Sequence, residues 1–302
     1  MTPDAPRYTP YDKGRFQLTL GIRAIDPAEW IEFDSHYTAH LAEKRRLLAE
    51  RPTEVFGATD GSLPAQTECL DMLLESLERT RPDMVELGGR TVHVVATGDR
   101  YEREAFAARP LDLAGRLVQE DLCLMAPHDG TYRLIAASLC FPSRWRLADK
   151  LGRPMVEIHQ PVPGFNDKLA RPVDRFFDRI EAGQVYMRLN WSVMDDPALF
   201  QPTGHGQSGI NNAITAANAG DMLWLRVERQ TFRRLPKSNA LVFGIKTIVD
   251  PLSSLVGRPE VARGLNEAIT DMPADTRRYK SMAPFADALA GWLDRAAVSP
   301  SD

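Results

Sequence analysis

The order of the expected elements predicts an α+β fold, with helices first, antiparallel strands in the middle and helices again at the end. Two pairs of strand-like runs joined by short turns lie in the middle of the chain, and such hairpins build antiparallel sheets. Apolar residues recur at helical spacing towards both ends. The sequence has no internal repeat or low-complexity linker, so we expect one domain over 1–302, with a core at about 85–250 and helical extensions at both ends.

The N-terminal third predicts two helices and a strand. The first helix is expected from Asp26 to about Arg51, because Asp26 can cap it, Pro27 suits its first position and apolar side chains follow helical spacing. A second apolar stripe at helical spacing predicts a helix over 64–80. The β-branched run 91–97 is typical of a strand.

Hairpin signals organise the middle of the chain. The dipeptide Asp129-Gly130 is a strong turn signal, and it separates the apolar runs 122–125 and 132–140. Two longer runs, 222–234 and 239–249, predict a second hairpin. The sheet is therefore expected to be built largely from hairpins.

Helical segments are expected between and after these strands. After Pro142 we expect a short helical segment that is closed by Gly152. Asn166 is expected to cap a further helix, and the C-terminal part from about Val261 predicts more helices.

Composition excludes several classes of function. The chain has 302 residues, of which 43% are hydrophobic and 26% are charged, as in ordinary globular proteins. Its formal net charge of -4 argues against nucleic acid as the main partner. The start lacks the apolar core of a secretory signal, no run reaches the roughly 18 apolar residues of a membrane span, and the cysteines are widely spaced. We therefore expect a cytoplasmic protein without a membrane partner.

Two strand-like segments contain polar side chains that a buried strand does not need. The segment 184–194 alternates cleanly and places Arg188 and Asn190 on its polar face. In the segment 226–233, Glu228 and Arg229 point to opposite faces if the backbone is extended. Charge on both faces costs free energy unless the charges are paired or a ligand satisfies them.

These charges allow two interpretations. They form either an Arg–Glu network across the sheet or a polarised pocket wall. In the second case Glu228 would hold a cationic substrate, and an arginine would anchor a carboxylate or polarise bound oxygen. Arg188 and Asn190 would join that wall from an adjacent strand.

Common catalytic motifs are absent from the sequence. It contains no G-x-G-x-x-G after a strand, no G-x-x-x-x-G-K-[ST], no G-x-S-x-G and no H-E-x-x-H. A site that needs several protein ligands for a metal would have to be assembled from distant residues. A haem site needs less, because the macrocycle supplies four nitrogens and the protein supplies one axial ligand in an apolar pocket.

One histidine suits that role. His159 lies in the stretch Leu139–Phe165, between Ile158 and the stiff run Pro161–Pro163, which would fix its backbone. The alternative is a hydrogen-bonded structural histidine. Axial ligation by Cys140 is a further possibility, although it lies in an apolar strand where thiols are usually packed.

The sequence resembles the haem-dependent oxidative N-demethylase α-subunit family. The matching segments extend from about Trp30 to Thr247. The most specific blocks are I-H-x-P-V-P at 158–163 and R-V-E-R-Q-T at 226–231. The other blocks are Q-E-D-L at 119–122, L-C-F-P-S-R-W at 139–145, D-K-L-G at 149–152 and R-L-N-W at 188–191. Phe232 replaces an expected leucine, which is a volume-conserving change.

The resemblance implies a PAS-like core, an antiparallel sheet with helices around a haem pocket. It also implies oxygen-dependent demethylation of a small secondary amine such as dimethylamine on haem b. NADPH, FMN and a [2Fe–2S] centre on partner reductase subunits would supply the electrons. A non-enzymatic haem sensor and a haem-free interaction subunit remain alternatives, although no output module is visible in the sequence.

The resemblance also implies roles for single residues. It makes His159 the axial iron ligand. The residues expected beside the haem are Pro161, Val162 and Trp145. The residues expected on the distal wall are Arg226, Glu228 and Arg229, with Arg188 and Asn190 on the neighbouring strand.

Overall fold

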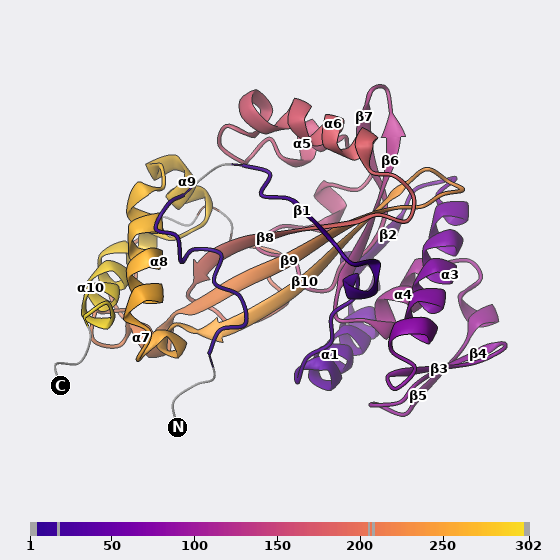
Figure 1. Cartoon of the computed structure of the whole chain (residues 1–302), viewed down its shortest axis with the longest axis horizontal. Helices are drawn as coiled ribbons and strands as arrows, with labels where there is room; N and C mark the ends of the chain where they lie inside the picture. Colours follow the sequence, from indigo (N-terminus) through magenta and orange to yellow (C-terminus); the bar gives the residue numbers. More distant parts are fainter. Residues whose placement is uncertain (1–4, 17–18, 205, 207–208, 299–302) are drawn as a thin grey trace.

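A seven-stranded antiparallel sheet organises the computed structural model, which describes residues 5–16, 19–204, 206 and 209–298. The strand order is β1-β8-β9-β10-β6-β7-β2 (Figure 1). These strands are β1 Arg23–Ile25, β8 Val185–Met194, β9 Trp224–Arg234, β10 Leu241–Pro251, β6 Asp121–His128, β7 Thr131–Ser138 and β2 Phe56–Ala58. The α+β class expected from the sequence is confirmed.

Both expected hairpins are present. Strands β9 and β10 pair along their whole length, from Leu241 opposite Arg234 to Pro251 opposite Trp224. Strands β6 and β7 meet at the dipeptide Asp129-Gly130, whose φ angles are 47° and 76°. Two adjacent positive φ angles match the right-handed twist of the flanking strands, which explains why this dipeptide marks the turn.

Helices from the N-terminal half cover the lower side of the right-hand part of the sheet, together with a second sheet of order β3-β4-β5 (Figure 1). Their bounds are α1 Tyr37–Glu50, α2 Pro52–Val55, α3 Leu63–Thr80, α4 Pro110–Leu117, β3 Val85–Gly88, β4 Thr91–Val94 and β5 Asp99–Glu102. The helix expected over 64–80 and the strand expected from Thr91 are confirmed, and the strand ends at Val94.

The single helix expected from Asp26 to Arg51 is wrong over its first 11 residues, 26–36. Asp26 does cap, by accepting from the backbone N–H of Ala28, but it caps only a 3-10 turn, Pro27–Glu29. The helix itself begins at Tyr37. The intervening backbone stays irregular, and its carbonyl groups accept hydrogen bonds from sheet side chains instead of from a following helical turn.

Short helical pieces lie above the sheet, and the C-terminal helices lie at its left end (Figure 1). The upper pieces are α5 Met155–Ile158, a π-helical turn Phe165–Leu169 and α6 Ala170–Arg179. The C-terminal helices are α7 Ala219–Met222, α8 Pro259–Asp271, α9 Ala274–Tyr279 and α10 Ala286–Ala296. None of the described helices is both long enough and apolar enough to cross a membrane.

Two helical expectations need correction. The segment after Pro142 forms only a 3-10 turn, Leu147–Asp149, which ends at Lys150; Gly152, with a φ of 77°, lies beyond this turn and donates its N–H to the carbonyl oxygen of Leu134. Asn166 makes no capping hydrogen bond, because it lies inside the π-helical turn and the following helix begins at Ala170.

The N-terminal segment runs along the sheet before it pairs as β1. Tyr11 is buried against the edge of Trp191, with 5.4 Å between the ring centroids. The backbone of Asp12 passes so close to α8 that a Cβ on Gly264 would lie 2.5 Å from its carbonyl oxygen. The backbone N–H of Phe16 donates to Asp271 at 3.1 Å. The start of the chain is therefore held against the C-terminal helices.

Candidate functional site

A cavity of about 830 Å³ lies between the upper face of the sheet, the α5–α6 region and the two ends of the chain. This volume is in the upper part of the range usual for small-molecule and cofactor pockets. Strands β8 and β9 form one wall, and the segments 9–16 and 276–281 contribute to the lining. Much of the remaining wall is apolar. The apolar lining includes Met125, Leu134, Ile158, Val173, Phe177, Phe232 and Ile245.

His159 lines this cavity immediately after α5. Its Nδ1 hydrogen-bonds the carbonyl oxygen of Met155 at 3.1 Å, and its ring stacks on Phe165 with 4.3 Å between the centroids. Burial, followed by the charge of Lys150, lowers the pKa of His159 to about 4. The imidazole is therefore neutral at pH 7. Because a proton on Nδ1 is needed to donate to the carbonyl, Nε2 keeps its lone pair.

Two of the three other residues expected beside the cofactor also line the cavity. They are Trp145 and Val162, whereas Pro161 is exposed and lies outside the lining. Trp145 carries the ammonium of Lys150 over its ring, at 4.0 Å from the centroid. Cys140 is buried away from the cavity lining, and burial raises the pKa of its thiol, so the structure gives no support to thiolate ligation.

The sheet contributes a hydrogen-bonded carboxylate. Glu228 Oε2 accepts from the amide of Asn190 at 3.2 Å and from the amide of Gln230 at 2.9 Å. Asn190 lies directly opposite Glu228 in the β8–β9 register, which explains why the two side chains meet on one face. Both amides bind the same oxygen. Oε1 takes part in neither of these two bonds.

A lysine from the C-terminal region completes this group. Lys280 Nζ donates to the carbonyl oxygen of Trp191 at 2.5 Å and to Asn190 Oδ1 at 3.3 Å. Burial lowers the pKa of Lys280 to about 8, while the negative charge of Glu228 acts in the opposite direction. Sequence reasoning missed Lys280, because it follows a short helix 90 residues beyond Asn190 and no local pattern marks it.

Arg188 also lines the cavity, opposite Gln230 in the register. Its Nε is buried without a hydrogen-bond partner among the described residues. Burial lowers the pKa of Arg188, and the charge of Glu228 only partly opposes this effect. Of the expected distal residues, the structure thus brings Glu228, Asn190 and Arg188 together.

The other two expected distal residues lie elsewhere. Arg226 shares the face of Glu228, but its guanidinium donates to the carbonyl oxygen of Phe141 at 2.7 Å and is not part of the cavity lining. Arg229 points to the opposite face of the sheet, as strand alternation requires, and cannot form a wall of this cavity. The geometry corrects the expectation for both arginines.

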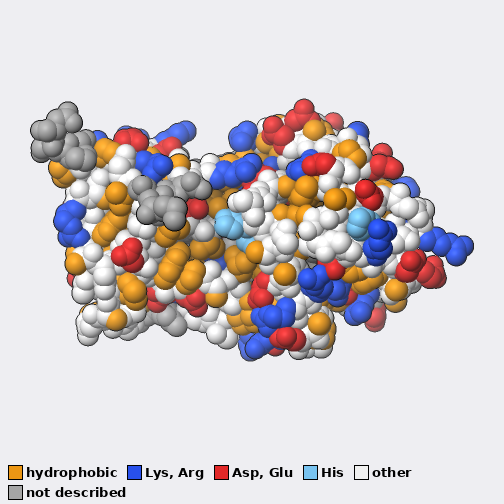
Figure 2. Space-filling model, turned by 90° about the horizontal axis from the view of Figure 1, so that it is seen from below, with side chains coloured by type: hydrophobic (Ala, Val, Ile, Leu, Met, Phe, Trp, Pro, Cys, Tyr) orange, Lys and Arg blue, Asp and Glu red, His pale blue; other side chains and the backbone are white. Residues whose placement is uncertain are grey.

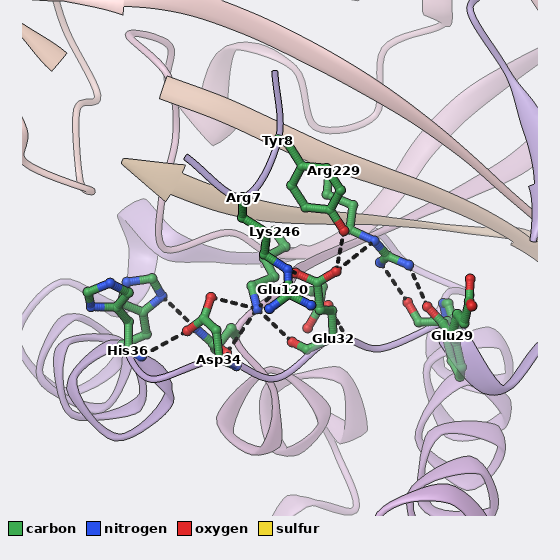
Figure 3. Close-up of polar contacts among 12 residues, drawn as sticks. Arg7, Tyr8, Glu29, Glu32, Asp34, His36, Glu120, Arg229 and Lys246 are labelled. Carbon is green, nitrogen blue, oxygen red and sulfur yellow. Dashed lines mark hydrogen bonds and ion pairs between the residues drawn. The ribbon is translucent and has the colours of Figure 1, made fainter. Parts of the chain in front are cut away.

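The opposite face instead holds a network of paired charges (Figure 3). Arg229 donates to the carbonyl oxygens of Glu29 and Trp30 and lies 3.4 Å from Glu32 Oε2. Lys246 Nζ lies 2.8 Å from Asp34 Oδ2 and 3.5 Å from Glu32 Oε1. The charged strand therefore lines a cavity on one face and takes part in a network of paired charges on the other.

A comparison of the sequence with known protein families gives a match that covers most of the chain. A family model described as haem-dependent oxidative N-demethylase, alpha subunit-like, matches residues 21–290. The chain belongs to this family. The matched range contains the polar cavity residues His159, Glu228, Asn190, Arg188 and Lys280, although the lining segment 9–16 lies outside it.

The described residues fit a haem of the kind that this family name implies. The wall is largely apolar, and a neutral histidine with a free Nε2 lines it. The bond from Nδ1 to the carbonyl of Met155 is the kind of contact that orients an axial imidazole and raises its basicity. Among the described residues, no group of three or more His, Cys, Asp or Glu side chains is arranged to hold a metal ion.

Proposed function

We propose that this chain is the haem-binding subunit of an oxidative N-demethylase that acts on a small secondary amine, such as dimethylamine, with oxygen. The observation that carries the proposal is the presence, in one cavity, of the neutral His159 and the partly buried carboxylate Glu228. Membership of the family supports the haem, and the antiparallel sheet with α5 and α6 across one face supports a PAS-like core at about 85–250. His159 is the proposed axial ligand.

A bound haem b would supply oxygen activation and accept electrons, and the residues of the chain would hold and orient it. His159 would provide Nε2, and stacking on Phe165 would keep its ring from rotating. Trp145 and Val162 would pack against the macrocycle, because both line the same cavity. Apolar surroundings limit water access and so protect the reacting centre.

Glu228 is the proposed binding group for the substrate ammonium. Asn190 and Gln230 fix its Oε2, which leaves Oε1 to accept an N–H from the amine. A carboxylate that is partly withdrawn from solvent selects a cation over a neutral molecule of the same size, because a neutral molecule leaves the charge uncompensated. Lys280 holds Asn190 from the other side, so the orientation of Glu228 depends on the C-terminal region.

The electrons are proposed to come from other chains. An alpha-subunit-like family suggests partner subunits, and this sequence contains neither a dinucleotide fingerprint nor a cysteine cluster of its own. NADPH, FMN and a [2Fe–2S] centre would then belong to reductase partners in the cytoplasm.

An absorption spectrum after haem reconstitution tests the axial ligand. We expect a Soret band that is lost or shifted in His159→Ala and retained in His93→Ala, a histidine that pairs with Glu86 on the small sheet. Retention of the unchanged wild-type spectrum by His159→Ala would disprove the assignment.

Oxygen uptake then tests the activity. With a supplied reductant, oxygen consumption should rise when dimethylamine is added. Haem binding without any amine-dependent consumption would favour a haem sensor. Failure to bind haem would favour an interaction subunit.

A further inference from the structure

Basic side chains outnumber acidic ones in the cavity, although the chain as a whole has a net charge of -4. Among the described lining residues, seven are Lys or Arg and two are carboxylates. The outer face in Figure 2 contrasts with this, because acidic and basic side chains are intermixed there. A cavity whose charge opposes that of the whole chain favours an occupant that carries at least one negatively charged group.

The deeper charged groups show the same imbalance. Lys150, Arg188 and Lys280 line the cavity together with Glu228, and the charge of Glu228 favours the charged form of all three. Burial lowers the pKa of each of these cations, because desolvation disfavours the charged form. One carboxylate that already accepts two amide hydrogen bonds does not neutralise three cations.

Arg188 is the least satisfied of the three. Lys150 lies over the ring of Trp145, and Lys280 donates to the carbonyl of Trp191 and to Asn190. Arg188 Nε has no partner among the described residues and is buried. A buried guanidinium nitrogen without a hydrogen-bond acceptor costs free energy. The planar guanidinium group as a whole matches the two oxygens of a carboxylate.

We propose that Arg188, with Lys280 adding positive charge beside it, binds a carboxylate group of the molecule that fills the cavity. Two sources have this chemistry. One is a propionate of the haem, and the other is the carboxylate of an N-methyl amino acid that serves as the amine substrate. The inference deepens the proposed function, because it concerns the same cavity.

The first test compares haem b with its dimethyl ester, in which both propionates are neutral. If Arg188 binds a propionate, wild-type protein should bind haem b at least about tenfold more tightly than the ester, as expected for a hydrogen bond to a charged group. Arg188→Gln should abolish that preference. Arg188→Lys keeps the charge without the fork and should retain only part of it.

The second test compares dimethylamine with N-methylglycine, by titrating the Soret band of the reconstituted protein. If Arg188 binds a substrate carboxylate, N-methylglycine should bind at least about tenfold more tightly than dimethylamine, and Arg188→Gln should remove the difference. In that case haem b and its ester should bind equally well.

Arg233→Gln is the matched control for both tests. Arg233 lies on the same sheet and also has a buried Nε without a partner in the described part of the chain, but it stacks over Trp30 outside the cavity. Its substitution should leave both preferences unchanged. If Arg188→Gln does not fold, Lys280→Gln should weaken the same preference.

The outcomes separate this inference from the proposed function. If wild-type protein prefers neither haem b over its ester nor N-methylglycine over dimethylamine, the carboxylate site is disproved even when haem binds through His159. If haem does not bind, the proposed function fails. Calorimetry of N-methylglycine on the haem-free wild type and Arg188→Gln then decides the carboxylate site, because equal or absent binding to both would disprove it.

Discussion

Strand β9 carries charged side chains on both of its faces, and the two faces differ in how completely those charges are paired within the chain. On the lower face, here called the paired face, Arg229 and the neighbouring Lys246 of β10 contact carboxylates and carbonyl oxygens of the segment 29–34 (Figure 3). On the upper face, here called the cavity face, Arg188 and Lys280 line the cavity together with one carboxylate, Glu228, whose charge acts on both of them.

The difference shows what buried charge can do in one sheet. On the paired face, a hydrogen bond to Lys246 overcomes the effect of burial and lowers the pKa of Asp34 to about 2. That network is closed by the chain itself and supports the fold. On the cavity face, Arg188 Nε lacks a hydrogen-bond acceptor among the described residues, so a bound ligand can supply that acceptor. The following predictions test this division.

The largest effect is expected for Lys246→Met on the paired face. The substitution leaves Asp34 and Glu32 without their shared cation in a buried site. We expect the free energy of unfolding to fall by about 3–5 kcal/mol, as when one partner of a buried ion pair is removed. Urea denaturation measures it, with the exposed Lys237→Met as a control that changes stability by less than about 0.5 kcal/mol. A loss no larger than that of the control would contradict the structural role of the network.

On the cavity face, Glu228→Gln should affect binding more than folding. The isosteric amide removes the charge that would hold an ammonium, so the dissociation constant for dimethylamine should rise about 10- to 100-fold. A titration of the Soret band measures this change. Glu157→Gln, at an exposed position outside the lining, is the control and should bind the amine as the wild type does. Equal affinity of wild type and Glu228→Gln would remove Glu228 from the substrate site.

Acid should act on the paired face through His40. Its Nδ1 contacts the amide of Gln119 at 3.1 Å, and burial lowers the pKa of His40 to about 4. Because the unfolded chain binds this proton below about pH 6.5 and the folded chain does not, stability falls as the pH is lowered from about 6.5 towards 4.

His40→Gln should therefore lose part of that acid sensitivity, by up to about 2 kcal/mol between pH 6.5 and pH 5. Urea midpoints at the two pH values measure it. His128→Gln, at the partly exposed hairpin turn, should keep the sensitivity of the wild type. If His40→Gln and the wild type lose equal stability on acidification, His40 does not titrate as proposed.

The smallest effect is expected for Arg188→Met without a ligand. Because Arg188 Nε has no partner among the described residues, an apolar side chain of similar length should leave the stability unchanged or raise it by about 1 kcal/mol. Arg229→Met, the matched change on the paired face, should destabilise the protein instead. Urea denaturation of the two haem-free variants compares them, and a loss in Arg188→Met as large as in Arg229→Met would end the distinction between the faces.

Much of the fold could be predicted from local sequence signals. Period-two alternation and the Asp129-Gly130 turn predict β8 and the hairpins, because these patterns follow from strand geometry alone. The break before Tyr37 could not be predicted. The segment 30–36 has good helical spacing, but its carbonyl groups bind Arg229 and Lys246 from strands some 200 residues away, so tertiary contacts override its helical preference.

The candidate site divides in the same way. Strand alternation places Glu228 and Arg229 on opposite faces, but it does not say which face is hollow. The exclusion of Arg226 depends on the carbonyl of Phe141, and the inclusion of Lys280 depends on where the C-terminal helices pack. Such long-range contacts leave no periodic signal in the sequence.

The wall of the cavity includes residues from the N-terminal region, in the segment 9–16, and from the C-terminal region, around Lys280. During synthesis the wall of the cavity is therefore incomplete until the residues around Lys280 have been made and the N-terminal segment has packed into place. Release of a ligand would therefore depend on how often these two segments open as well as on the strength of the ligand's own contacts, which links its residence time to local opening of the protein.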